Sequence, residues 1–456
     1  MIQKYLLKKS KNWLIVLNSL LKYDGVIKIM SLSLSTSKVS PKLTSTQLNR
    51  VPLLKNTNTF FLFLFILLTY IVPTLRIGPI PIRAEFLLTT LYLCLLLLFF
   101  KQNLKFKKFG SIHALSFLLL FLYSFLLVFI DMFKYSVGLK TIFTPFIWII
   151  YFLTIFTFGI IYKNVNYKTV FNFLKFIIWF ELILGVLQRF NVFGIKTWGI
   201  FEVISANNAS YYVDLNSDRV FGTIGNPVWF NFVMYGISKI FHINTRKSYW
   251  LILSFCFIAL GFSRNIAVFA IVFELISLFL ARSFVDFLGR LKRFIAIFIP
   301  LLIIFVVIIS KNEYLSRIVL SVLNSPHNDY SVNYRMSMFS WLSQSLVNPL
   351  FGDIWDVNLP PYIDMGYILT IKRYGIIGAI ILYSIFFAPI IFNRIFKDSY
   401  QRNSYIFIGL FCLTTEITTV VTTNTLFVGH IVLWVFITEI FHIYRSNMDG
   451  NLEVVK

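Results

Sequence analysis

The chain has 456 residues, of which 58% are hydrophobic and 13% charged, against about 25% charged in an ordinary soluble protein. A soluble fold cannot bury this much apolar surface, which excludes a cytosolic enzyme, a disordered chain and a disulfide-rich secreted module and indicates a membrane protein. The 42 Lys and Arg outnumber the 19 Asp and Glu, and this excess indicates loop orientation and attraction to anionic lipid heads or phosphates rather than nucleic-acid binding.

Residues 1–58 are predicted to be a basic cytoplasmic tail rather than a cleavable signal peptide. Asp24 is the only acid in this segment. Its apolar stretch, Trp13 to Leu21, is too short to span a membrane, and no small-residue cleavage site follows it. This stretch suggests a short helix that lies on the surface of the anionic leaflet.

Residues 59–443 are predicted to form an all-α, polytopic transmembrane domain of about twelve helices, because they contain that many apolar runs of spanning length. Cations are concentrated in alternate loops, which places both the first tail and a second tail, residues 444–456, in the cytoplasm. The predicted spans are residues 60–75, 83–100, 112–131, 142–162, 169–190, 226–243, 248–263, 265–281, 294–310, 370–392, 404–421 and 425–443.

Two segments, at about 191–225 and 311–365, fit neither spans nor tight turns, and both fall outside the cytoplasm in this topology. They are polar and contain the acids and cations that are scarce elsewhere. Long loops of this kind are functional or disordered, and their Trp, Tyr, Phe and Pro residues favour order. We therefore look for chemistry in these two extracytoplasmic loops.

The first outer loop passes through Arg219 and Gly222 to Asn226 and Pro227, where a predicted span begins. Asn226 suits the N-cap and Pro227 the first turn of that helix. The outward helix N-terminus and the preceding Arg219 together predict an anion site. The plainer alternative is an arginine that snorkels beside an ordinary helix start.

Arg264 follows Ser263 between two apolar runs at the predicted outer face. An arginine at membrane depth costs about 2.5–3.5 kcal/mol on insertion scales, so it usually faces protein or water. The alternative interpretation is a turn residue at the membrane interface.

The second outer loop is predicted to contain a short helix, residues 335–346, that stops before Pro349. Arg335 begins this helix, and Asp364 precedes the turn that leads into the tenth span. Lys372 and Arg373 either add to a cationic pocket or mark the outer membrane surface. A solvated loop with ordinary charges is the alternative for the whole segment.

In their order along the chain, these motifs resemble the O-antigen polymerase and ligase superfamily, whose members are GT-C-like membrane glycosyltransferases that build bacterial surface polysaccharide outside the cytoplasmic membrane. The resemblance covers about residues 200–392, and within the superfamily it is mainly to the polymerase branch. It is carried by Arg219, Gly222, Asn226-Pro227, Ser263-Arg264, Arg335, Pro349-Leu350-Phe351-Gly352, Asp364, Gly366-Tyr367, Gly375 and Gly378.

The resemblance implies that Arg219 and Arg335 hold the diphosphate of an undecaprenyl-diphosphate-linked oligosaccharide. Guanidinium groups grip phosphate oxygens bidentately and offset the charge that develops on a diphosphate leaving group. The remaining residues assigned to substrate binding are Arg264, Asn226, His327, Lys372 and Arg373. The implied partners are this lipid-linked substrate, membrane lipid, a chain-length regulator and a flippase, and not nucleic acid. The sequence has no metal-ligand spacing, so no metal or cofactor is expected.

The ligase branch carries a histidine near the position of Asp364, so the aspartate favours a repeat-unit polymerase over a ligase. Asp364 is the first choice for a catalytic base, which must lie within hydrogen-bond range of the acceptor hydroxyl. A structural cap is the alternative role for Asp364. His327, Asp329 and Glu202 remain open as bases.

Two other functions remain open, an O-antigen-ligase-type transferase and a flippase or exporter of lipid-linked sugars. Four acids inside predicted spans would suit a proton path in a transporter: Glu181, Glu274, Glu416 and Glu439. The favoured interpretation is that each pairs with a neighbouring cation, such as Arg189 two turns after Glu181, or lies near a helix end. The polar residues gather in outer loops rather than at mid-membrane, which favours surface chemistry over transport.

Overall fold

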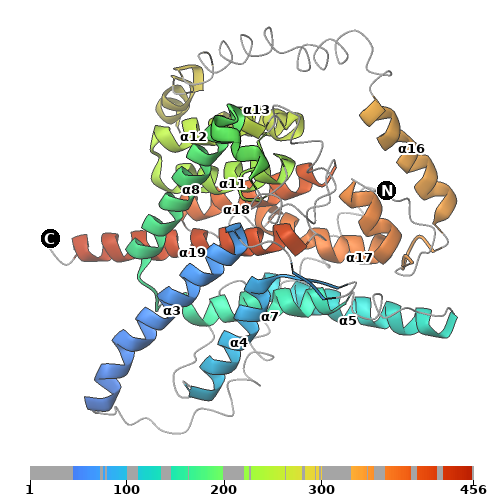
Figure 1. Ribbon diagram of the computed structural model, residues 1–456, viewed down its shortest axis with the longest axis horizontal. Helices are drawn as coiled ribbons and strands as arrows, with labels where there is room; N and C mark the ends of the chain where they lie inside the picture. Colours follow the sequence, from blue (N-terminus) through green and yellow to red (C-terminus); the bar gives the residue numbers. More distant parts are fainter. Residues whose placement is uncertain are drawn as a thin grey trace, which may run out of the picture. The chain divides into compact units, whose positions relative to one another are not determined.

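The computed structural model describes residues 45–71, 75–77, 80–99, 111–134, 145–162, 164–198, 220–224, 227–261, 263–279, 283–292, 294–296, 299, 330–346, 348–353, 365–391, 398–417 and 425–453 (Figure 1). Contacts divide the chain into two units, 1–53 and 54–456. The second unit contains every site considered below.

The predicted helical class is confirmed in the described residues, with one small addition. A two-stranded antiparallel hairpin pairs β1 (Leu75–Ile77) with β2 (Ile80–Ile82), where only a loop between spans was expected. The helices are α3 (Ser45–Ile71), α4 (Ala84–Phe99), α5 (Ser111–Lys134), α7 (Phe146–Ile161), α8 (Tyr167–Arg189), α11 (Pro227–Thr245), α12 (Ser248–Gly261), α13 (Arg264–Phe279), α16 (Tyr330–Ser345), α17 (Gly366–Ile391), α18 (Ser399–Thr415) and α19 (Thr425–Glu453), with a 3₁₀ helix at Val192–Thr197.

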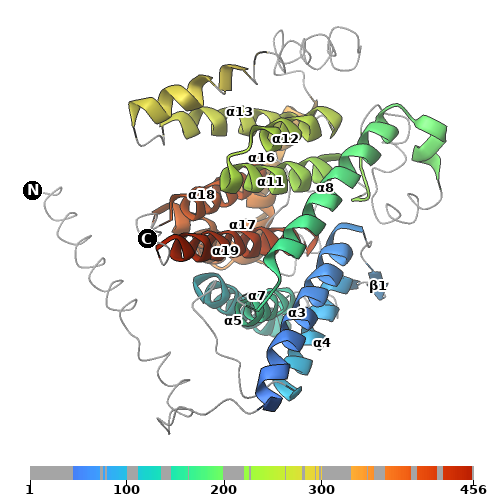
Figure 2. The same cartoon turned by 90° about the vertical axis from the view of Figure 1, so that its left-hand side faces the viewer.

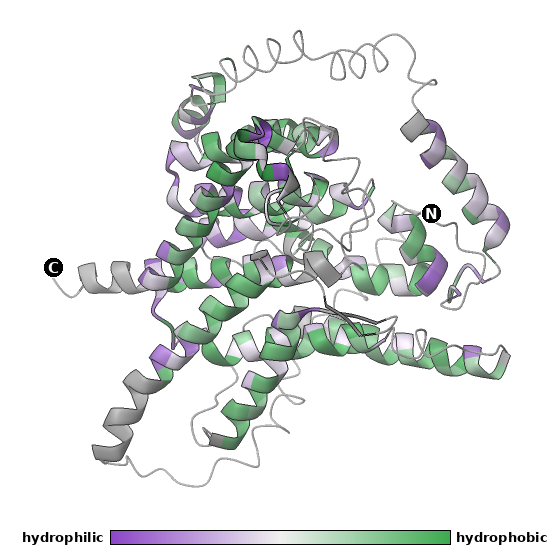
Figure 3. Cartoon of the chain, viewed as in Figure 1, coloured by the Kyte–Doolittle hydropathy of each residue, from purple (hydrophilic) through white to green (hydrophobic). Residues whose placement is uncertain are grey.

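Three helices in the described residues contain stretches long and apolar enough to cross a membrane: Ser116–Phe133 in α5, Tyr167–Arg189 in α8 and Gly366–Phe387 in α17. Five further apolar helical stretches are shorter. Large apolar side chains of α4 and α5, such as Leu91, Leu98 and Leu122, are exposed. Hydrophobic residues predominate along both helices (Figure 3). Apolar surface of this extent suggests association with lipid.

Helix α11 lies at the centre of the packing, in contact with α8, α12, α18 and α19 (Figure 2). Most of its side chains are buried on every face, which is the pattern of a core helix rather than an amphipathic one. Gly236 permits the close approach of α19, because a Cβ atom at this position would overlap the Trp434 ring. Helix α11 also packs on α18, where the rings of Phe232 and Phe411 stack with their centres 4.6 Å apart.

Helix boundaries differ from the predicted ones at two places. Helix α3 joins the end of the predicted basic tail and most of the first predicted span in one 27-residue helix. Helix α16 begins at Tyr330 rather than at residue 335, and it stops at Ser345, ahead of Pro349 as predicted.

Candidate functional site

Helix α17 is broken in its first half at Gly375, and a turn from the second predicted outer loop fills the break. Gly375 has φ +64° and ψ −173°, a conformation essentially confined to glycine. The backbone N–H of Ile376 donates to Pro349 O at 2.9 Å, and that of Ile377 to Leu350 O at 3.1 Å. The turn therefore satisfies groups that a broken helix would otherwise leave without partners.

The two glycines of this junction are in direct backbone contact. Gly352 has φ +75°, and a Cβ atom on it would overlap Gly375 N. From α5, the Tyr123 hydroxyl lies 2.8 Å from Tyr374 O and 3.2 Å from Phe351 O. Motif residues that are more than twenty positions apart in sequence thus form one compact junction.

Helix α16 packs against the half of α17 that precedes the break. Met338 is buried against Met365 and Ile368, with Trp341 beside them. The ammonium group of Lys372 is buried, donates to Ser345 O at the end of α16 and lies 5.8 Å from the centre of the Trp341 ring. A lysine that binds a last-turn carbonyl stabilises a helix end, so Lys372 positions α16.

This packing places the cations of α16 and α17 on neighbouring elements. Arg335 lies one turn before Met338 on α16 and is half-buried. Arg373 is half-buried on α17, next to Lys372. Partly buried cations attract phosphate oxygens more strongly than cations in water do.

Helix α8 holds the segment 220–224 of the first outer loop through two side chains. Gln188 Oε1 accepts from Gly222 N at 2.9 Å and from Phe221 N at 3.3 Å. Glu181 accepts from Thr223 N at 3.2 Å and from the Thr223 hydroxyl. Gly222 has φ +56°, and a Cβ atom there would overlap Glu181, so the motif glycine is required by this contact.

Replacing Thr223 by valine should lower the free energy of unfolding by about 1–3 kcal/mol, because it leaves a buried carboxyl group without one donor. The same hydroxyl also lies 2.9 Å from Tyr70 O. Thermal unfolding of the purified protein in lipid nanodiscs measures the effect. Thr414→Val is the matched control, since the Thr414 hydroxyl bonds only to carbonyls of its own helix, and equal losses in both variants would contradict the expectation.

A buried polar cluster lies beside this segment, where α3 ends and α4 begins. Arg83 Nε donates to Glu85 at 2.6 Å, and Arg83 Nη2 donates to Thr69 O at 3.1 Å. The rings of Tyr70 and His430 stack 5.0 Å apart. His430 Nδ1 is buried and has no hydrogen-bond partner among the residues that the structure describes.

Aromatic side chains connect this cluster with the break in α17. Trp148 of α7 lies 5.8 Å from Tyr374 and 5.6 Å from Tyr151, measured between ring centres. Tyr151 in turn contacts Phe86, which follows Glu85 on α4. The outer-loop junction and the buried ion pair are therefore parts of one packed region.

The structure describes the side chains of three of the eight predicted site residues, Arg335, Lys372 and Arg373, and brings their helices together. Arg264 is the first residue of α13, and its side chain is not among those that the structure describes. The other four lie outside the described residues: Asp364, Arg219, Asn226 and His327. Pro227 begins α11, as its predicted place in a first helical turn requires.

The four acids of the predicted spans all have partners. Glu274 pairs with Lys239, and Glu181 binds Thr223 rather than the expected Arg189. The Glu416 carboxyl group accepts from the Tyr383 hydroxyl at 3.4 Å, and its backbone carbonyl accepts from Gly366 N at 2.9 Å, which joins the end of α18 to the start of α17. Glu439 accepts from Gln401 and Tyr405, each at 2.7 Å.

Sequence reasoning missed Gln188, His430 and Tyr123. Gln188 had a usable signal, because it follows Glu181 by seven residues and so lies on the same face of α8. His430 and Tyr123 had none, since each lies in an apolar helix and contacts distant elements.

No protein-family model matches this chain, and no curated protein sequence matches it either. In the part of the chain that the structure describes, no group of three or more His, Cys, Asp or Glu side chains is arranged to hold a metal ion.

Proposed function

We propose that this protein is a polysaccharide repeat-unit polymerase of the bacterial cytoplasmic membrane, with about twelve spans in a GT-C-like fold and both termini in the cytoplasm. It transfers a growing glycan from undecaprenyl diphosphate to a sugar hydroxyl of the next lipid-linked repeat unit. The bond from the anomeric carbon to the diphosphate oxygen breaks, and a bond to the acceptor oxygen forms. The acceptor proton passes to a base, and undecaprenyl diphosphate leaves.

The observation that carries this proposal is the packing of α16 on the broken helix α17. It holds Arg335, one turn before Met338, near the start of α17, and it rests on the Pro349–Gly352 turn that fills the break at Gly375. A glycosyl transfer that releases a diphosphate needs cations on a rigid support, and this packing gives Arg335 such a support.

Within this proposal the cations bind the diphosphate and Asp364 is the base. Arg335 grips the phosphate oxygens, whose negative charge grows as the glycosidic bond breaks. Lys372 keeps α16 in place through Ser345 O. Asp364 directly precedes Met365, which is buried in the contact between α16 and α17, so this contact anchors the chain beside the proposed base.

Replacing Arg335 by alanine should lower glycosyl transfer by about 100-fold or more, as loss of a donor to a developing oxyanion does. Arg335→Lys should restore only part of the activity, because an ammonium group keeps the charge but not the bidentate geometry. Polymer length in cells, compared at equal membrane content of the protein, measures both. Arg402→Ala, on α18, is the control cation, and polymer of normal length from Arg335→Ala cells would overturn the assignment.

A flippase of lipid-linked sugars is the second candidate, favoured by the buried Lys239–Glu274 pair between α11 and α13 and by the buried Arg83–Glu85 pair at the start of α4. Mass spectrometry of lipid-linked saccharides from cells lacking the protein separates the functions, with sidedness determined by labelling intact cells. Single units at the outer face support the polymerase. Single units at the inner face support the flippase, and long polymer still on the lipid supports a ligase.

A further inference from the structure

A second site lies at the other end of α11 from the 220–224 segment. A cavity of ≈100 Å³ opens between the last turns of α11, the start of α12, the second half of α13, the helical residues 284–292 and the start of α18. A water molecule needs roughly 10–15 Å³ of such volume, so the cavity has room for a group of several heavy atoms. The basic loops that flank it indicate that it faces the cytoplasm.

The lining of this cavity carries an excess of positive charge. Lys239, Arg246 and Arg290 face it together with only two carboxylates, Glu274 and Asp286. Both carboxylates are already paired: Glu274 binds Lys239, and Asp286 accepts from Arg290 Nη2 at 2.8 Å. No carboxylate pairs with Arg246 in the described part of the chain, which leaves a net charge of one positive when His242, the histidine of the lining, is neutral.

Arg246 is held in place without being neutralised. It follows the last residue of α11 with φ +56°, and its guanidinium carbon lies 4.6 Å from the centre of the Tyr400 ring. The guanidinium carbon of Arg445 lies 4.5 Å from the centre of the same ring. The tyrosine therefore supports two cations and restricts the motion of each.

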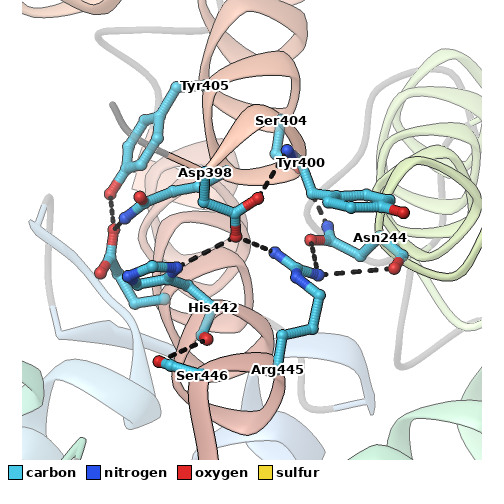
Figure 4. Close-up of polar contacts among 10 residues, drawn as sticks. Asn244, Asp398, Tyr400, Ser404, Tyr405, His442, Arg445 and Ser446 are labelled. Carbon is cyan, nitrogen blue, oxygen red and sulfur yellow. Dashed lines mark hydrogen bonds and ion pairs between the residues drawn. The ribbon is translucent and has the colours of Figure 1, made fainter. Parts of the chain in front are cut away.

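The nearest acid on α18 is occupied by other groups. Asp398 accepts from Arg445 at 2.6 Å and contacts His442 Nδ1 at 3.0 Å (Figure 4). Burial alone would raise the pKa of Asp398, but the hydrogen bonds with His442 and Arg445 outweigh it and lower that pKa well below its ordinary range. Asp398 therefore already has two partners. Arg246 remains able to bind an anion from outside the protein.

The cavity wall is partly apolar. The apolar residues of the lining are Ile243, Leu251, Phe273, Leu278 and Phe294. A free inorganic anion gains nothing from such a wall, whereas a phosphodiester that carries a glycerol and acyl chains does.

We propose that this cavity binds a singly charged phosphate group, presented by the head of an anionic phospholipid in the cytoplasmic leaflet. The phosphate contacts Arg246, and the glycerol and first methylenes lie on the apolar wall. Basic pockets between transmembrane helices bind phosphate-bearing lipid heads in this manner. The site is separate from the region around Gly375 and does not depend on the function proposed above.

Native mass spectrometry of the full-length protein, titrated with phosphatidylglycerol in neutral detergent, tests the lipid source. Thermal unfolding in phosphatidylcholine nanodiscs, with and without inorganic phosphate, tests the free anion. Saturable phosphatidylglycerol binding supports the proposal with lipid as the source. Stabilisation by phosphate alone supports the phosphate site and assigns it to a free ion, and the absence of both effects overturns the proposal.

Two variants connect the binding to this cavity. Arg246→Ala should weaken binding about fivefold, since one cation near a membrane surface contributes about 1 kcal/mol. Ser248→Asp adds an acid to the lining but suits the first turn of α12, so it should weaken binding while unfolding in phosphatidylcholine stays unchanged. Lys247→Ala, the adjacent cation outside the lining, should have a smaller effect. Equal weakening by Arg246→Ala and Lys247→Ala, or normal binding by Ser248→Asp, would show that the lipid binds elsewhere.

Discussion

Replacing Gly375 by alanine should destabilise the folded protein by about 3–6 kcal/mol, through backbone strain and overpacking together. The φ of +64° with an extended ψ is strained for every L-residue, and a Cβ atom would overlap Leu350 O and Gly352 N. The turn would have to leave the break, which exposes backbone groups of α17 inside the membrane. We therefore expect little folded protein in membranes, measured as yield and as the midpoint of thermal unfolding in nanodiscs.

Gly289→Ala is the matched control for this variant. Gly289 lies in the helical residues 284–292, and among the described residues no atom beyond its chain neighbours and its own helix backbone comes within 4 Å of a Cβ built there. Alanine is favoured over glycine in a helix by about 1 kcal/mol, so this variant should be unchanged or slightly more stable. A Gly375→Ala protein as stable as the Gly289→Ala protein would mean that α17 is continuous in the membrane.

Replacing Glu274 by leucine should destabilise the protein by about 3–5 kcal/mol, because it leaves Lys239 charged and buried without its partner. The Glu274 and Lys239 side chains are 8% and 2% exposed, so bulk water screens the remaining charge only weakly. Lys239→Met alone should have a similar cost. The double variant should be close to the original protein, since apolar residues of similar volume often replace a buried ion pair without loss.

Chemical unfolding of the two single variants and the double variant in one detergent gives this comparison as a double-mutant cycle. Asp286→Asn is the control, because its ion pair with Arg290 is partly exposed and such pairs contribute about 0–1 kcal/mol. A double variant as unstable as the single variants would contradict this expectation. It would show that apolar residues cannot replace the ion pair at this position.

The sequence predicted those parts of the fold that depend on local chemistry. The start of α11 at Pro227 follows from the fixed φ of proline, and the end of α16 follows from the restriction that Pro349 places on the residues before it. The positive φ angles of Gly352 and Gly375 were not predictable, because each is imposed by the other backbone across the break.

The number of spans illustrates another limit of sequence patterns. Helix α11 has buried Asn231, Ser238 and Lys239 among its apolar residues, and protein rather than lipid surrounds it. Helix α12 has 14 residues, about 21 Å at 1.5 Å per residue, against a hydrocarbon core of about 30 Å. Hydropathy counts such helices as spans, although their length and burial depend on the neighbours they pack against.

The break in α17 also separates the helical registers of its two halves. One added residue in an unbroken helix turns every later side chain by more than a quarter of a revolution. In α17, an insertion between Gly366 and Lys372 would reorient only the half that carries Lys372 and Arg373, because Gly375 and the turn fix where the second half starts. The break therefore confines the change in register to the residues before Gly375, whereas in an unbroken helix the same insertion would also turn the residues that follow.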